Sequence, residues 1–507
     1  MKRSIRLTIA RNAVANVARG TAAAVAALAV PPFLTRALPP EKYGAWALVL
    51  QLAAYVAYFE FGIHTAVGTF VAHGNERSDF EHRDKIVNTA FALLTGACLL
   101  ALVLIALLIA FLPEFFRKMP AGLYPDVRIA LALVGGSLAI GLPASVFSGI
   151  FIGLQRYGTL SVIVGGSKIL GAVLLVVIAR HGGGIPAMAL AMATVSIASY
   201  ASQGFMSRRY APDIRFSRGL VSRDIGHELV SYCVSLSVWS FSMLLISGLD
   251  LTLVGVLDFG NVAFYAVAAS LVTFAAGLQH HVFGATVPST AVLHARGDSW
   301  RLGRMVIDGT RYGMVLLLLT HLPFLLVAKP ILRIWVGPIY AVRATIFLQL
   351  LVLANIVRLS AVPYNFTLIG TGQQRLVILT PILEGIINLA VSVVAGYYWG
   401  AVGIAFGTLC GAFVSIGGHF FYNMPRTTEV RFSRREYVLD SVLRPLVCVL
   451  PCACVWLIQN AMVDLQGPIR MLVVLTGGTV SAYCLWRWGL IGSDRQRIRR
   501  LSRLSSL

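Results

Sequence analysis

The chain consists of long apolar runs separated by short polar segments, a pattern that continues from Asn12 almost to Leu490. Crossing a hydrocarbon core of about 30 Å takes about 20 helical residues, and most of the runs reach that length. Pro40, Pro113 and Gly183 mark connections between runs. The pattern predicts an all-α polytopic membrane protein with about 14 transmembrane helices. The predicted spans cover residues 12–35, 41–72, 86–112, 127–154, 158–180, 184–206, 226–256, 260–294, 305–328, 343–370, 374–396, 401–423, 439–460 and 468–490.

Composition supports the membrane class, because 57% of the 507 residues are hydrophobic and only 12% are charged. A strongly positive net charge, here +21, is also a feature of nucleic-acid-binding proteins. In this chain, however, the Lys and Arg residues lie between apolar runs and in a C-terminal tail, which is typical of cytoplasmic loops. We therefore expect no nucleic-acid partner. The basic bias predicts that both termini are cytoplasmic, and the first span is expected to be an uncleaved helix rather than a signal peptide.

All seven cysteines fall inside apolar runs, where a thiol usually packs as a small, soft side chain. Cys448, Cys452 and Cys454 lie close together, but no second pair of metal ligands follows them. We therefore expect no disulfide framework and no metal site, and no motif in the sequence indicates a cofactor.

The first half of the chain recurs in the second half at an offset of 219 residues. Residues 153–156 (GLQR) fall on residues 372–375 (GQQR), and Asp79 falls on Asp298. An offset of six spans keeps both copies in the same orientation, so the copies are parallel repeats around an axis along the membrane normal. We therefore predict two pseudosymmetric six-helix lobes plus two C-terminal helices. The predicted domains are an N-lobe at 1–207 (spans 1–6), a cytoplasmic linker at 208–225, a C-lobe at 226–423 (spans 7–12), a second linker at 424–438, and spans 13–14 with a basic cytoplasmic tail at 439–507.

Five short stretches of the sequence carry a resemblance to a known superfamily. They are residues 12–32, 38–49 (LPPEKYGAWALV), 59–63 (FEFGI), 153–156 and 372–375. The chain resembles the polysaccharide-exporter branch of the multidrug, oligosaccharidyl-lipid and polysaccharide (MOP) flippase superfamily, in particular the O-antigen repeat-unit flippases, although Glu60 stands where many relatives carry Asp. The resemblance implies export of an O-antigen or exopolysaccharide repeat unit on a polyprenyl-pyrophosphate carrier, across the bacterial cytoplasmic (inner) membrane. The partners it implies are a lipid-linked oligosaccharide and membrane lipids, with a glycan polymerase and a chain-length regulator downstream.

Basic residues inside the predicted spans are candidates for binding such a cargo. A charge at the bilayer centre costs at least about 2.5 to 3.5 kcal/mol on insertion scales, so it usually faces a cavity or a partner. Arginine suits a pyrophosphate because its planar fork binds phosphate through two donors and stays charged. The predicted substrate-binding residues, which would line a wet, cationic cleft, are Arg19, Asn16, Asn12, Lys168, Arg311, Arg358 and Asn355.

Several of these residues also have a purely structural interpretation. Arg19 can pair with a neighbouring helix or extend to the membrane interface, and Arg311 can pair with Asp308 on its own helix. Lys168 occupies nearly the same place in the first repeat as Glu384 in the second, so the two can form a bridge between the lobes. The adjacent Gly165-Gly166 pair predicts close helix packing that leaves Lys168 room only toward a cavity.

Acids and histidines within the spans are candidates for ion coupling, because intramembrane carboxylates and imidazoles can relay protons. The candidates are Glu60, Asp250, His64, Asp308 and Glu384. Glu60 and His64 lie four residues apart on one helix face. The alternative for this pair is a packed, hydrogen-bonded group without a role in ion movement.

Other functional classes fit the sequence less well. A membrane glycan polymerase, ligase or glycosyltransferase would present large outer loops or soluble catalytic segments, whereas the loops near 113–126 and 329–342 are short and hold few catalytic groups, so we expect no enzyme. The chain lacks a G-x-x-x-x-G-K-[ST] loop, which excludes a nucleotide-driven pump within it. A multidrug or cation antiporter of the same fold is the alternative that stays open.

Overall fold

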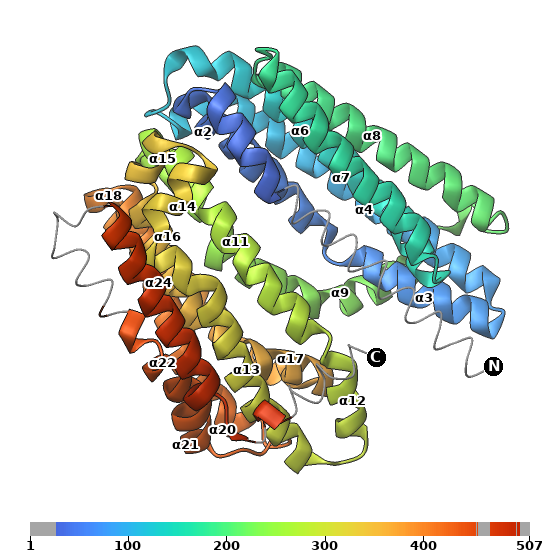
Figure 1. Ribbon diagram of the computed structural model, residues 1–507. Coiled ribbons are helices and arrows are strands. Elements are labelled where there is room, and N and C mark those ends of the chain that lie inside the picture. Colours follow the sequence, from blue (N-terminus) through green and yellow to red (C-terminus); the bar gives the residue numbers. More distant parts are fainter. Residues whose placement is uncertain (1–26, 453, 455–466, 493, 497–507) are drawn as a thin grey trace, which may run out of the picture.

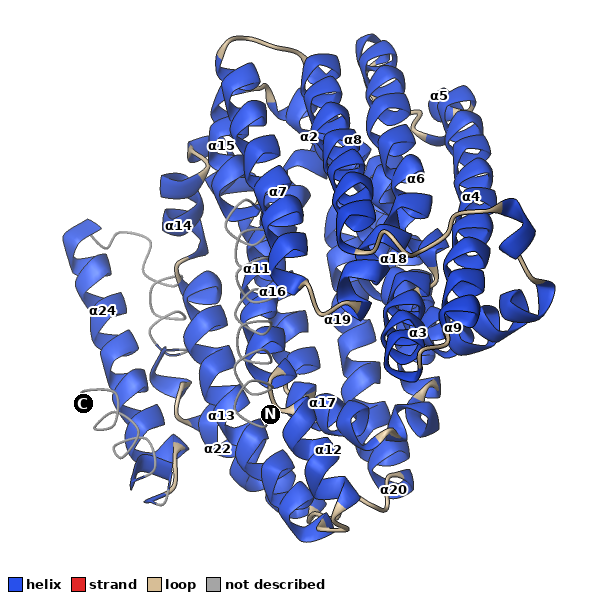
Figure 2. Cartoon of the chain, turned by 90° about the vertical axis from the view of Figure 1, so that its right-hand side faces the viewer, coloured by secondary structure: helices blue, strands red, loops and turns tan. Residues whose placement is uncertain are grey.

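The computed structural model describes residues 27–452, 454, 467–492 and 494–496. Within these residues every regular element is a helix and none is a strand (Figure 2). The N-terminal bundle contains a helical segment at 27–37, α2 (Pro40–Ala54), α3 (Ile63–Arg77), α4 (Phe80–Ala110), the short α5 (Leu112–Phe115), α6 (Tyr124–Gly153), α7 (Tyr157–Arg180) and α8 (Ile185–Tyr210).

The C-terminal bundle follows from residue 223 onward. Its elements are α9 (Arg223–Met243), a π-helical turn (Leu244–Gly248), α10 (Asp250–Leu257), α11 (Val262–Gly284), α12 (Val287–Ala295), α13 (Ser299–Leu326), α14 (Ala328–Trp335), α15 (Pro338–Arg343), α16 (Thr345–Leu359), α17 (Val362–Thr371), α18 (Leu379–Trp399), α19 (Ala401–Gly418), α20 (Met424–Arg426), α21 (Arg434–Glu436), α22 (Arg444–Val447) and α24 (Gly467–Cys484). Figure 1 shows the two bundles meeting at the end that holds α2 and α15 and diverging toward α3 and α12.

The all-helical, polytopic membrane architecture is confirmed. Of the described helices, nine are long and apolar enough to cross a membrane, or up to ten if the bent pair α16 and α17, which meet at 43°, counts as one span. The predicted number of about 14 stays a prediction. The spans predicted at 12–35 and 439–460 lie partly outside the described residues, and the one predicted at 226–256 is interrupted by the π-helical turn.

The span predicted at 41–72 is broken in the middle. A 3₁₀ turn at Tyr55–Glu60 follows α2, and Phe61 and Gly62 then adopt positive φ values of 51° and 75° before α3 begins. A left-handed backbone cannot continue an α-helix, and glycine adopts it without steric cost. Hydropathy misses this break because the apolar run continues through it.

Local geometry repeats at the 219-residue offset seen in the sequence. Asp79 accepts a hydrogen bond from the backbone of His82 and begins α4, and Asp298 does the same for Arg301 and begins α13. The preceding residues, Ser78 and Gly297, both have positive φ. An aspartate at this position satisfies backbone N–H groups that have no partner within the helix. The two halves therefore share a turn and a cap, while the exact domain boundaries stay a prediction.

The linker between the bundles is bound to α4 by buried polar groups. Arg83, only 2% exposed, donates to Asp213 Oδ2 at 2.6 Å and to Asp84 Oδ1 at 3.0 Å. Its hydrogen bond to Asp213 lowers the pKa of that carboxyl group. Asn88 bonds the backbone of Arg215 and Ser217. The linker therefore continues the packed surface of the N-terminal bundle rather than hanging free between bundles.

At the end where the bundles meet, they share one apolar core. Trp46 and Leu48 of α2 are buried together with Val254 of α10 and Val267 of α11. Gly255 permits this approach, because a side-chain carbon there would lie 3.0 Å from Phe116 and 3.1 Å from Leu48. Small residues are the usual means by which membrane helices pack closely. The bundles are therefore sealed on one side of the molecule by apolar packing.

Candidate functional site

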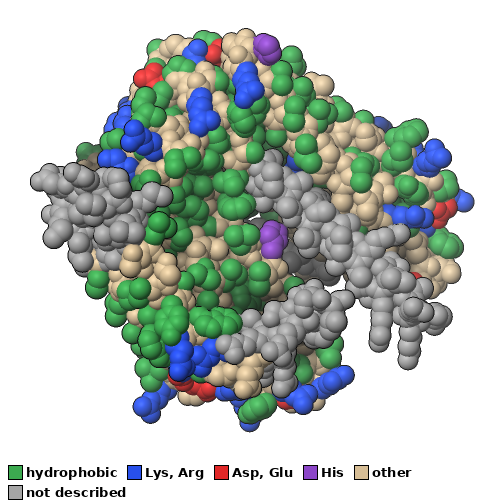
Figure 3. Space-filling model, viewed as in Figure 1, with side chains coloured by type: hydrophobic (Ala, Val, Ile, Leu, Met, Phe, Trp, Pro, Cys, Tyr) green, Lys and Arg blue, Asp and Glu red, His purple; other side chains and the backbone are tan. Residues whose placement is uncertain are grey.

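A cavity of about 1250 Å³ lies between the bundles. Side chains from α2, α7 and α8 form one wall, and side chains from α10, α11, α16, α18 and α19 form the other. In Figure 3 the surface is hollowed between the two bundles and edged by hydrophobic side chains. The shared apolar core described above closes the cavity at the end that holds α2 and α15.

Lys168 projects from α7 into this cavity. Its side chain is exposed there and makes no ion pair with any described residue. The close helix packing predicted at Gly165 and Gly166 is wrong for the part of the chain that the structure describes, because a side-chain carbon on either glycine would meet none of its atoms within 4 Å. Lys168 faces the cavity because α7 contributes this face to the wall. Tyr200 and Gln203 of α8 also line this wall.

Arg358 lines the opposite wall and is paired. Its Nε lies 2.5 Å from Glu384 Oε1, and both residues belong to the C-terminal bundle. The predicted bridge between Lys168 and Glu384 is therefore wrong, since Lys168 lies on the opposite wall of the cavity and Arg358 of α16 pairs with Glu384 of α18. Arg358 Nη2 is buried without a hydrogen-bond partner in the described structure. Asn355, one turn earlier, is buried and also lines the cavity.

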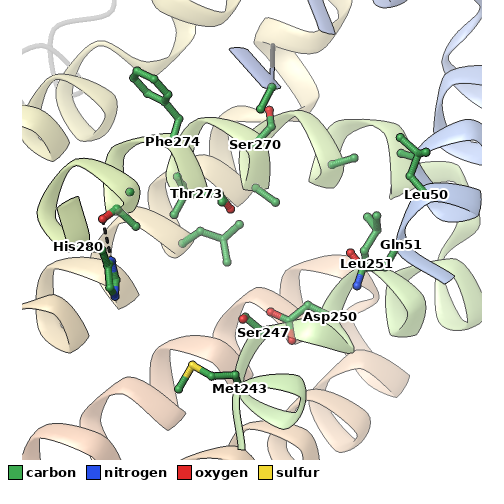
Figure 4. A pocket seen from close by; sticks show the side chains of 18 of the residues that line it. Leu50, Gln51, Met243, Ser247, Asp250, Leu251, Ser270, Thr273, Phe274 and His280 are labelled. Carbon is green, nitrogen blue, oxygen red and sulfur yellow. Dashed lines mark hydrogen bonds between the residues drawn. The ribbon is translucent and has the colours of Figure 1, made fainter. Parts of the chain in front are cut away.

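Asp250 forms a polar centre at the closed end of the cavity. It is buried and accepts hydrogen bonds from Tyr265 at 3.2 Å and from Thr408 at 2.9 Å. A π-helical turn lies just before Asp250 and offers the Ile246 and Gly248 carbonyls to side-chain donors; such turns are frequent at functional sites. Figure 4 shows Asp250, Ser247 and Gln51 gathered at one end of the pocket and His280 at the other.

The residues that bond to this turn were not predicted from the sequence. Gln51 Nε2 and Tyr55 Oη, both on the N-terminal bundle, each donate to the Gly248 carbonyl at 2.7 Å. Asn388 donates to the Ile246 carbonyl at 2.5 Å. The sequence offered one signal for them, since Asn388 lies one helical turn after the candidate acid Glu384. Asn388, Gln51 and Tyr55 carry no charge, however, so the cost of burying a charge did not mark them as candidates.

Other predicted site residues lie away from the cavity. Arg311 is 1% exposed and pairs with Asp308 at 2.7 Å and with Asp494 at 2.8 Å, so its predicted role as a cleft cation is wrong and the local ion pair is what the structure contains. Asp308 is likewise part of that ion pair and not of the cavity wall. Asp494 near the C-terminus is itself buried, and a buried carboxylate is costly unless a cation pairs with it. The ion pair with Asp494 therefore accounts for the position of the Arg311 side chain.

Glu60 and His64 are neighbours, as their spacing predicted, but they do not line the cavity. Glu60 Oε1 lies 2.8 Å from His64 Nδ1, a short contact that is an ion pair only when the imidazole is protonated. Asn12, Asn16 and Arg19 lie outside the described residues.

The described cavity wall is not predominantly cationic, contrary to prediction. Its charged side chains are Lys168 and Arg358 on one hand and Asp250 and Glu384 on the other, so they balance formally. Arg358 is held by Glu384, which leaves Lys168 as the cation in the described wall that no acid neutralises. Any selectivity for anions from these residues therefore depends mainly on Lys168.

Comparison with known proteins places this fold. Residues 9–294 match the family described as polysaccharide biosynthesis protein. No curated protein sequence matches the chain. The structure is similar to an inward-facing multidrug resistance MATE family transporter of the MOP superfamily, with 14% identity, a TM-score of 0.67, and coverage of 82% of this chain and 98% of that one.

Two further solved structures share the architecture. The lipid II flippase MurJ in an inward closed conformation is 12% identical, with a TM-score of 0.69, and the alignment covers 94% of this chain and 98% of the MurJ chain. A MOP superfamily transporter from Pyrococcus furiosus is 14% identical, with a TM-score of 0.55, and the alignment covers 84% of this chain and 96% of the transporter chain. These likenesses are to transporters and a flippase rather than to enzymes. The chain belongs to the polysaccharide biosynthesis protein family, and it has a multi-pass helical fold similar to that of these MOP superfamily transporters and of the lipid II flippase.

Proposed function

We propose that this protein moves a polyprenyl-pyrophosphate-linked oligosaccharide, an O-antigen or exopolysaccharide repeat unit, outward across the bacterial inner membrane. The observation that carries the proposal is the cavity of about 1250 Å³ between two bundles, with Lys168 on its wall and no described acid paired with that lysine. Pockets for drug-sized ligands usually measure about 300 to 1,000 Å³, so the space suits a larger headgroup. The membership in the polysaccharide biosynthesis family supports a glycan cargo.

A cavity of this kind addresses the physical obstacle to flipping. A sugar headgroup with a pyrophosphate cannot enter hydrocarbon, because unpaired polar and ionised groups there cost many kcal/mol. Within the cavity the headgroup meets water and polar side chains such as Gln203 and Asn355, while the prenyl chain stays in lipid. The lobes at 1–207 and 226–423 then rock against each other to expose the headgroup to one side or the other.

Direction in this proposal comes partly from the membrane potential. Two negative charges that move outward through an inside-negative membrane gain about 4 to 5 kcal/mol per 100 mV. The proposed topology places both termini and both linkers, 208–225 and 424–438, in the cytoplasm. The basic tail at the end of the segment 439–507 lies on the same side. A glycan polymerase and a chain-length regulator then consume the product outside.

Flipping can be measured with the purified protein in liposomes that carry a fluorescent polyprenyl-pyrophosphate oligosaccharide in both leaflets. We expect an impermeant reducing agent to bleach the inner-leaflet label only when the protein is present, because only then does label exchange between leaflets. Protein-free liposomes are the control. If the label stays protected while a lipophilic cationic dye is moved, the chain is a multidrug antiporter and the glycan proposal is wrong.

We further propose Asp250 as the ion-coupling residue, since it is the buried carboxylate at the closed end of the cavity and touches both α11 and α19. Asp250→Asn keeps a side-chain oxygen that can accept the hydrogen bonds from the Tyr265 and Thr408 hydroxyl groups but removes the ionisable group, so it is expected to lower ion-gradient-driven flipping about tenfold. Asp258→Asn is the matched control, because Asp258 bonds Ala401 and Asn261 outside the cavity. An equal response of both variants to the gradient contradicts the assignment. Glu384, already paired with Arg358, and the Glu60 and His64 pair are weaker candidates.

A further inference from the structure

The end of the molecule where the bundles meet carries a set of hydrogen bonds from one bundle to the other. Arg36, in the helical segment 27–37, donates through Nη2 to the carbonyls of Ile334 at 3.1 Å and Trp335 at 3.3 Å, the last residues of α14. Thr35 donates to the next carbonyl, that of Val336, at 3.4 Å. In the opposite direction, Trp335 donates its indole N–H to the Leu28 carbonyl at 3.1 Å.

A second contact of the same kind lies beside it. Lys118 follows α5 of the N-terminal bundle and donates through Nζ to the carbonyl of Leu257 at 2.5 Å. Leu257 is the last residue of α10 in the C-terminal bundle. The loop that carries Lys118 is fixed in place, because Phe116 and Met119 on either side of it are buried in the shared core.

The two contacts have one physical cause. The last carbonyls of a helix have no partner within the helix and form the negative end of its dipole, so a cation bound there is stabilised. Usually the helix or its own bundle supplies that cation, as Arg128 does by donating to the Ile109 carbonyl near the end of α4. At α14 and α10 the cation comes from the opposite bundle. These bonds therefore exist only while the bundles touch at this end.

The opposite end of the molecule is built differently. There the linker residues bond within their own bundle, as Asp213 does with Arg83 and Glu436 with Arg304. Among the described residues, the hydrogen bonds from one bundle to the other lie between the cavity and the α14 end. At the linker end His82 of α4 lies only within 4.0 Å of Glu228 of α9, a pair that is ionic when the histidine is protonated. Separation at the α14 end thus requires the Arg36 and Lys118 bonds to break, whereas separation at the linker end breaks none of these bonds.

We propose that Arg36 and Lys118 are gate residues, which keep the outer end of the cavity closed by capping helices of the opposite lobe. Which end is outer rests on the proposed topology and function, but the gate itself does not depend on the cargo. Release of both caps frees the lobes to part and lets the headgroup leave, and their re-formation closes the exit while the cavity faces the other side.

Access to the cavity from the α14 end tests the gate without any cargo. Ser270, on the cavity wall (Figure 4), is replaced in Ser270→Cys, and labelling by an impermeant thiol reagent added from outside is timed in oriented vesicles. The chain without this substitution gives the background from its seven native cysteines. We expect Arg36→Ala and Lys118→Ala each to speed labelling about tenfold, because each removes a charged hydrogen bond from the closed state.

Two further variants make the result decisive. Arg128→Ala removes the same type of cap within one bundle and should leave labelling unchanged, and Arg36→Lys should restore slow labelling because it keeps a cationic donor. Size-exclusion profiles confirm that each variant is folded. Labelling rates for Arg36→Ala and Lys118→Ala that equal the rate for Arg128→Ala overturn the gate assignment. Because the readout needs no lipid-linked sugar, that result is distinguishable from failure of the flipping assay.

Discussion

Lys168→Ala is expected to lower the affinity of the cavity for an anionic headgroup by at least about tenfold, which corresponds to about 1.4 kcal/mol. Two opposite charges 4 Å apart gain about 4 kcal/mol at an effective dielectric constant near 20, and water in an open cavity weakens this. Because Lys168 makes no ion pair with a described residue, its charge is available to cargo, whereas that of Arg358 is shared with Glu384. Concentration dependence of flipping in liposomes measures the effect.

Controls separate the charge from the shape of the side chain. Lys168→Arg should retain most activity, because guanidinium keeps the charge and binds phosphate well. Lys85→Ala is the matched control, since Lys85 is a partly exposed residue of α4 that pairs with Glu81 at 2.6 Å outside the cavity. Unchanged headgroup affinity in Lys168→Ala would remove this lysine from cargo binding.

Arg83→Ala is expected to lower the free energy of unfolding by about 3 to 5 kcal/mol, because it leaves the buried carboxylate of Asp84 without its cationic partner. Asp84 is 6% exposed and would keep only its hydrogen bond from the Arg215 backbone, while Asn75 and Asp213 would also lose a donor. Thermal unfolding in detergent, followed by the loss of the monodisperse size-exclusion peak, measures the change. Faster trypsin cleavage in the linker at Arg215 or Arg218 should accompany it.

A surface charge gives the comparison for that variant. Arg301 lies near the start of α13, the repeat counterpart of α4, and pairs with Asp298 while its side chain is 64% exposed. Exposed ion pairs contribute about 0 to 1 kcal/mol, so Arg301→Ala should change unfolding little. Equal stability of the two variants would show that the buried cluster around Arg83 does not hold the linker on α4.

Hydropathy was sufficient to place most helices but not their interruptions. The predicted span 86–112 corresponds to α4 at Phe80–Ala110, and the added turn at its start follows from Asp79, whose capping role a pattern of apolar residues does not register. The break at Phe61 and Gly62 and the π-helical turn at Leu244–Gly248 lie inside apolar runs. Both depend on backbone dihedral angles and on neighbouring helices rather than on polarity.

The candidate site was predicted in part. Lys168, Arg358, Asn355, Asp250 and Glu384 do line one cavity, because a charge within a span has few places to go other than a wet space or a partner. The same argument could not tell these two outcomes apart. Arg311 took a partner, Asp494, which lies 183 residues away in the chain, and Arg358 took Glu384, 26 residues away.

The sequence by itself determined that this is a helical membrane protein with an internal repeat, because span length and hydrophobicity are local properties and the repeated turn and cap at Asp79 and Asp298 are encoded residue by residue. Only the tertiary structure decided which charged side chains pair with each other, which charge on the cavity wall has no partner among the described residues, and which lobe caps the helix ends of the other. Helical periodicity fixes the face of its own helix on which a side chain lies, whereas pairing across helices depends on how those helices are placed and turned in space.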